Sequence, residues 1–92
     1  MTIYGIPEEV GRCYSCREAI KLCKENNLEY TFIPVMYADP ESPTGFGFYR
    51  DEIKKLAIKL HKDNLRIVYP QIFEDEKYIG SLLQFKKYIG DE

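Results

Sequence analysis

Two cysteines separated by two residues, Cys13 and Cys16, form the group in this sequence best suited to chemistry. A Cys-x-x-Cys pair either cycles between dithiol and disulfide or supplies two ligands to zinc. This pair follows a short β-prone run and opens a segment with helical periodicity. Free backbone N–H groups and the helix dipole favour an anion at such a position. We therefore predict redox chemistry, with Cys13 as the attacking thiolate of lowered pKa and Cys16, one turn deeper, as the resolving thiol.

Zinc binding is the competing interpretation of the pair, and it needs four ligands. The further candidates are Cys23 and His61. Cys23 lies seven residues beyond Cys16, about 10 Å along a helix, whereas sulfurs that share a zinc ion are only about 4 Å apart. We expect Cys23 to be a small core residue and His61 to be solvated at the end of a lysine-rich helix, so no metal site is predicted.

Charged and aromatic residues near the pair leave some roles open. Arg12 is adjacent to Cys13, and Arg17 follows one turn on, so both would favour a thiolate. Tyr14 either touches a ligand or partner at the mouth of the site or is simply exposed. A group of aromatic residues later in the chain either docks a partner or covers the start of the second helix: Phe46, Phe48 and Tyr49.

Periodicity and turn residues indicate the elements that hold the pair. The expected order is βαβαββα, with strands over 2–4, 30–35, 65–73 and 77–79, helices over 13–25, 53–60 and 81–89, and a loop over 38–47. Ser81 and Gln84 predict a capping box at the last helix. Pro70 interrupts an apolar run where a buried strand would lose a hydrogen bond, and this context favours a cis bond.

Composition limits the classes of function. The 92 residues predict one domain, 1–92, and the net charge of −2 argues against a nucleic-acid partner. Four lysines on the second helix (54, 55, 59 and 62) are interpreted as a solvated face. We expect neither a signal peptide nor a membrane span. The odd number of cysteines favours a reducing cytoplasm.

Three motifs, in order and over nearly the whole chain, resemble a glutaredoxin: CYSC at 13–16, YPQIF at 69–73 and IGS at 79–81. The likeness is greatest to the small glutaredoxins of T-even bacteriophages, which would place the protein in a host cytoplasm. The resemblance implies an α/β thioredoxin-like fold, with a central four-stranded mixed sheet flanked by three helices. It implies that Pro70 is cis and faces the dithiol, and that the backbone of Tyr69 pairs with the substrate chain.

The same resemblance implies a thiol–disulfide oxidoreductase without a bound cofactor. We expect a monomer, which is the default for a small one-domain redox carrier. It would reduce protein disulfides such as that of ribonucleotide reductase, and glutathione, thioredoxin reductase or both would reduce it in turn. Glutathione would then be a redox co-substrate, and the resemblance places a substrate and glutathione site at these residues: Arg12, Tyr14, Tyr69, Pro70, Gly80 and Ser81.

Several positions depart from the usual glutaredoxin pattern. Tyr14-Ser15 replaces an inner Pro-Tyr, Val10 replaces a basic residue, and Tyr69 replaces a valine. Leu83 stands where an aspartate normally receives the glutathione ammonium. The loss of one charged hydrogen bond costs about 1.5–3 kcal/mol, or roughly ten- to a hundredfold in affinity. We therefore expect weakened glutathione binding, partly recovered through the backbone N–H or hydroxyl of Ser81.

Two other classes of function compete with the redox interpretation. The chain could be a non-catalytic thioredoxin-fold subunit of a larger assembly, in which the dithiol is incidental. It could also be a small zinc protein. The Cys-x-x-Cys pair and Pro70 together favour the oxidoreductase.

Overall fold

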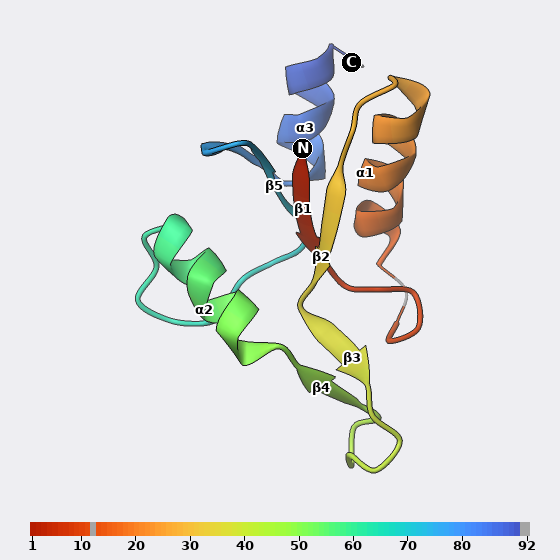
Figure 1. Ribbon diagram of the computed structural model, residues 1–92, viewed down its shortest axis with the longest axis vertical. Coiled ribbons are helices and arrows are strands. Elements are labelled where there is room, and N and C mark those ends of the chain that lie inside the picture. The colour runs from red at the N-terminus through yellow and green to blue at the C-terminus, as the bar shows by residue number, and fades with distance from the viewer. Residues whose placement is uncertain (12, 91–92) are drawn as a thin grey trace.

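The computed structural model describes residues 1–11 and 13–90 (Figure 1). Its elements in chain order are β1 (Thr2–Gly5), α1 (Tyr14–Glu25), β2 (Thr31–Pro34), β3 (Met36–Ala38), β4 (Phe46–Phe48), α2 (Arg50–Lys59), β5 (Gln71–Glu74), β6 (Lys77–Gly80) and α3 (Leu82–Ile89). Four strands form one sheet in the order β2-β1-β5-β6. β2 runs parallel to β1, whereas β5 runs antiparallel to β1 and β6 antiparallel to β5.

Alternating side chains place two hydrophobic clusters on opposite faces of this sheet. Ile3 and Ile72 pack with residues of α1 and α3 on one face. Tyr4 and Phe73 pack with residues of α2 on the other. Figure 1 shows the same layers, with α1 and α3 beside the sheet and α2 across from them. The predicted four-stranded mixed sheet flanked by three helices is confirmed, and the arrangement is compatible with a thioredoxin-like fold.

Local sequence signals explain where the helices begin and end. α1 starts directly after Cys13 and ends before Asn26, whose side-chain amide donates to the carbonyl of Leu22 at 2.9 Å. α3 begins with the expected capping box of Ser81 and Gln84. It ends at Gly90, whose φ of 75° lies in the left-handed region that glycine tolerates.

The prediction of an unbroken loop over 38–47 is wrong at both ends. Met36–Ala38 and Phe46–Phe48 pair as a small antiparallel sheet, β3–β4, which projects from the main sheet in Figure 1. Pro40, Pro43 and Gly45 lie in the turn between these strands, whereas Gly47 lies inside β4. Gly47 permits the pairing because a Cβ there would collide with the ring of Tyr37.

The predicted strand over 65–73 is also too long, because β5 begins only at Gln71. Pro70 has no N–H to donate to a sheet ladder, which accounts for a strand that begins after it. Residues 65–70 instead form an irregular segment that connects α2 to the sheet. Within residues 1–11 and 13–90, no helix is long and apolar enough to cross a membrane.

Candidate active site

The cysteine pair lies at the junction between the carboxyl end of β1 and the amino end of α1. Cys13 is the N-cap of α1, and a disulfide joins it to Cys16 with the two Cα atoms 5.3 Å apart. The backbone N–H of Cys16 donates to Sγ of Cys13 at 3.3 Å. Cys13 is partly exposed, whereas Cys16 is only 1% exposed. One sulfur is therefore accessible to a partner, and the other is held beneath it.

The end of β1 forms a close wall behind the buried sulfur. The backbone N–H of Ile6 donates to Sγ of Cys16 at 3.5 Å. A Cβ on Gly5 would lie 3.0 Å from that sulfur and 2.9 Å from Cε1 of Phe32. Gly5 is thus a site residue that sequence reasoning treated only as the end of a strand. The signal was present, because a glycine that ends the strand before a dithiol leaves room for a sulfur atom.

Pro70 lies at the same end of the sheet as the dithiol. The register of β1 with β5 pairs Tyr4 with Gln71, so the next residue along, Pro70, comes opposite Gly5. The Tyr69–Pro70 bond is cis, which confirms that expectation, and Pro70 is buried. Tyr69 packs toward the α2 face, and burial raises the pKa of its phenol. Adjacent residues therefore contribute to different places, with Pro70 opposite Gly5 at the dithiol end of the sheet and Tyr69 toward α2.

Gln71 is the second site residue that sequence reasoning missed. It is a buried polar residue, and its side-chain amide donates to the backbone carbonyl of Val68 at 2.8 Å. The hydroxyl of Tyr78 on β6 donates to the side-chain Oε1 of Gln71 at 2.6 Å. These bonds fix the segment before Pro70 to the neighbouring strand. The sequence signal was a glutamine inside an otherwise apolar run.

Gly80 and Ser81 reach the same end of the sheet, because β6 runs antiparallel to β5. Gly80 has φ of 128°, a conformation that favours glycine. The backbone N–H and hydroxyl of Ser81 both donate to Oε1 of Gln84, at 3.0 and 2.6 Å. Leu83 is 51% exposed. Both Ser81 donors that were expected to help glutathione are therefore already engaged within the capping box.

The other predicted site residues differ in how they are placed. Tyr14 follows Cys13 directly and is 66% exposed, so its side chain is accessible to a ligand or partner. Arg17 is exposed on α1, and its backbone N–H donates to the carbonyl of Cys13 at 3.1 Å. Arg12 lies outside the described residues.

The third cysteine is separate from the pair. Cys23 is a buried free thiol in the cluster between α1 and the sheet, and burial raises its pKa. That shift keeps the thiol protonated and therefore unreactive near neutral pH. Among residues 1–11 and 13–90, no group of three or more His, Cys, Asp or Glu side chains could hold a metal ion.

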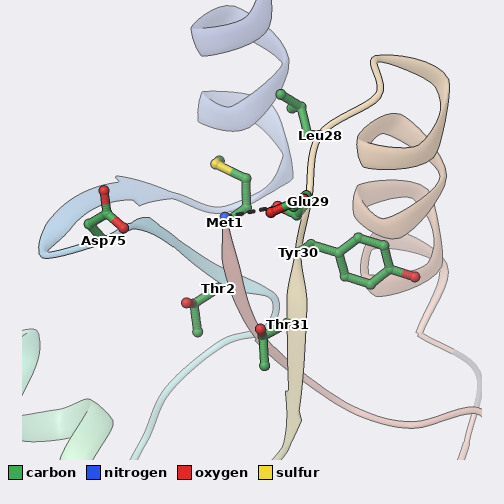
Figure 2. Close-up of a pocket in the computed structure, with 7 residues that line it drawn as sticks. All are labelled: Met1, Thr2, Leu28, Glu29, Tyr30, Thr31 and Asp75. Carbon is green, nitrogen blue, oxygen red and sulfur yellow. Dashed lines mark hydrogen bonds between the residues drawn. The ribbon is translucent and has the colours of Figure 1, made fainter.

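A shallow hollow of about 570 Å³ lies at the opposite end of β1 (Figure 2). There the amino group of Met1 donates to the carbonyl of Glu29 at 3.0 Å, and Asp75 approaches from the β5–β6 turn. Thr2 begins β1 at this hollow, whereas the dithiol follows the other end of the strand. The seven residues that line the hollow include no cysteine or histidine, so it is not part of the dithiol site.

Comparison with known proteins places this geometry in a family. No protein-family model matches the chain. The chain is 35% identical over 85 residues to an uncharacterized 11.8 kDa protein from the Gp55-nrdG intergenic region of Enterobacteria phage T4, covering 92% of this chain and 79% of that protein. It is 30% identical over 89 residues to a glutaredoxin of the same phage, covering 94% of each. With its Cys-x-x-Cys pair at the amino end of α1 and a cis-proline opposite the end of β1, the chain belongs to the glutaredoxin family.

Proposed function

We propose that this protein is a dithiol–disulfide oxidoreductase in which Cys13 attacks and Cys16 resolves. The observation that carries the proposal is the unequal exposure of two cysteines whose sulfurs are close enough to form a disulfide. The accessible one accepts a hydrogen bond from the first turn of α1. Such a bond favours a thiolate over a thiol, and the thiolate is the nucleophile in disulfide exchange.

The reaction has two exchange steps. In the first, the Cys13 thiolate attacks one sulfur of a substrate disulfide, forms a mixed disulfide and releases the other sulfur as a thiolate. In the second, the deprotonated Cys16 attacks Sγ of Cys13, which releases the remaining substrate thiol. The substrate gains two electrons and two protons, and the protein gains the disulfide between Cys13 and Cys16. The amide end of α1 stabilises the leaving Cys13 sulfur when a reductant reverses these steps.

Protein disulfides, such as that of ribonucleotide reductase, are the proposed substrates. The segment before Pro70 supports this choice because it lies outside the sheet ladder and can pair with an extended substrate chain. Glutathione and thioredoxin reductase are the proposed electron donors. Leu83 and the engagement of Ser81 by Gln84 both argue for a modest contribution from glutathione.

Turnover of a protein disulfide tests the function directly. The wild-type protein should catalyse reduction with NADPH and thioredoxin reductase, and more slowly with glutathione and glutathione reductase. Cys13→Ser should abolish turnover, whereas Cys16→Ser should accumulate a mixed disulfide visible by mass spectrometry. Cys23→Ser is the matched control and should keep turnover. Full activity in the Cys13 variant, or full partner function in a Cys13/Cys16 double serine variant, would refute the proposal.

A further inference from the structure

A second hollow, of about 310 Å³, lies between the start of α2 and the segment that leads to Pro70. Apolar side chains provide much of its lining, among them Phe48, Ile53 and Leu65. Tyr69 also lines it, so the hollow adjoins the residue directly before the cis-proline. Phe48 is 48% exposed and Leu65 is 44% exposed. Large apolar side chains left open beside a reactive centre are typical of a binding surface.

Two arginines, Arg50 and Arg66, line the same hollow and are both exposed. In the described part of the chain, the side-chain ion pairs join Lys21 to Glu25 and Lys55 to Glu52, and neither arginine takes part. Residues 50–66 hold six basic and three acidic side chains, a net charge of +3 within a chain whose net charge is −2. The lining of the hollow itself holds these two arginines and no acidic side chain, so both arginines are available to a carboxylate.

The hollow lies where it can bind the residues next to the reacting cysteine of a substrate peptide. Tyr69 packs toward α2, whereas Pro70 lies on the side of the dithiol. Successive side chains of an extended peptide point to opposite faces. When such a peptide pairs with the backbone of Tyr69 and directs a cysteine toward Cys13, its adjacent residues therefore point toward the α2 face, where the hollow lies.

We propose that this hollow selects protein substrates by binding an apolar side chain next to the reacting cysteine, while Arg50 and Arg66 pair with an acidic residue of the same segment. The occupant is an extended, acidic and apolar segment of a disulfide-bearing protein. This inference rests on the proposed oxidoreductase function and adds a preference for substrate sequence. Aromatic and arginine side chains around a desolvated apolar pocket are the residues that dominate binding energy at protein interfaces.

Peptides with one cysteine joined by a disulfide to 4-thiopyridine test the preference. Attack by Cys13 on the peptide sulfur releases 4-thiopyridone, so its absorbance reports the second-order rate constant. Three peptides are compared, in which the cysteine is flanked by Leu and Asp, by Leu and Lys, or by Ser and Asp. The reduced wild-type protein should react about five- to tenfold faster with the Leu/Asp peptide than with either of the others.

Surface variants assign this preference to the hollow. Arg50→Glu and Arg66→Glu should remove the advantage of Asp over Lys, and Leu65→Ala should reduce the advantage of Leu over Ser. Lys54→Glu makes the same change of charge on α2 outside the hollow and should keep both preferences. The preference for Asp should also shrink as salt concentration rises. Circular dichroism before each assay confirms that the variants are folded.

Three results would overturn the inference. The three peptides could react at equal rates, or Lys54→Glu could reduce the preferences as much as the arginine variants do. Arg66→Glu could also slow the reaction with glutathione joined to 4-thiopyridine as much as it slows the reaction with the Leu/Asp peptide. The last would assign the arginine to the tripeptide instead of a protein segment. Binding of serine versions of the peptides, measured by calorimetry on the oxidised protein, judges docking without any reaction. A protein that reduces no disulfide yet binds the Leu/Asp peptide selectively would refute the proposed function and keep the docking site.

Discussion

The strongest test of the site is the ionisation of Cys13 in a Cys16→Ser variant, which leaves one accessible thiol. Sγ of Cys13 accepts the N–H of residue 16 at 3.3 Å, and serine retains that backbone donor. A hydrogen bond to a charged group contributes about 1.5–3 kcal/mol, and the helix dipole adds about 0.3–1 kcal/mol. Because Cys13 is partly exposed, we take about 2–3 kcal/mol for the two together. The ratio of thiolate to thiol should then exceed that of the unfolded chain roughly 30- to 150-fold at the same pH.

The rate of alkylation by iodoacetamide as a function of pH measures this ionisation, with the same variant in guanidinium chloride as reference. As the pH is lowered, Cys13 in the folded protein should keep its reactivity toward iodoacetamide down to a lower pH than in the unfolded chain. A pKa lowered by folding also means that the folded chain binds fewer protons between the two pKa values. The unfolding free energy of the reduced variant should therefore rise with pH through that window, and the gain should vanish as pH falls through the folded pKa. Coincident alkylation profiles, or faster alkylation of Cys16 in a Cys13→Ser variant, would refute the assignment.

Three further substitutions probe the groups around the dithiol. Gly5→Ala should lower the unfolding free energy, measured by urea denaturation, by about 1–3 kcal/mol, because its Cβ would crowd Cys16 and Phe32. Gly11→Ala is the control and should change the unfolding free energy little, because a Cβ there meets nothing within 4 Å. Gln71→Leu should lower the unfolding free energy by about 1–3 kcal/mol and raise KM for a protein disulfide, because the Val68 carbonyl loses its donor. An unchanged KM would count against a role of Gln71 in positioning the segment before Pro70. Leu83→Asp should speed reduction by glutathione about fivefold by supplying a partner for its ammonium group, and equal rates at low ionic strength would contradict this.

Much of the main sheet could be predicted because its signals are local. The change from a short β-prone run to a period of three and four residues fixes the strand-to-helix junction that holds Cys13. Ser81 and Gln84 mark the start of α3, because in a capping box each side chain accepts a hydrogen bond from the backbone N–H of the other residue. The dithiol and the cis-proline could be predicted together because both motifs occur, in the expected order, in the glutaredoxin pattern that the chain resembles.

The β3–β4 hairpin could not be predicted in the same way, because each strand is only three residues long. Its stability depends on contacts between the strands, such as the ring of Tyr37 passing over Gly47. The secondary-structure propensities of the residues do not predict a contact between two strands. The same reason hides Gln71, whose importance comes from Val68 and from Tyr78 on another strand.

One capping interaction at the start of α3 bears on whether glutathione can serve as an electron donor, as proposed. In α3 the Gln84 side chain takes both donors of Ser81, so the bond that stabilises the helix start also occupies groups a ligand would need. Gln84→Ala should free those donors at a cost of about 0.5–2 kcal/mol in unfolding free energy. If they bind glutathione, its reduction rate should rise even though stability falls, and combining Gln84→Ala with Leu83→Asp should raise it further. A rate that falls along with stability would mean that the order of the helix start, and not the availability of its N–H groups, limits glutathione binding.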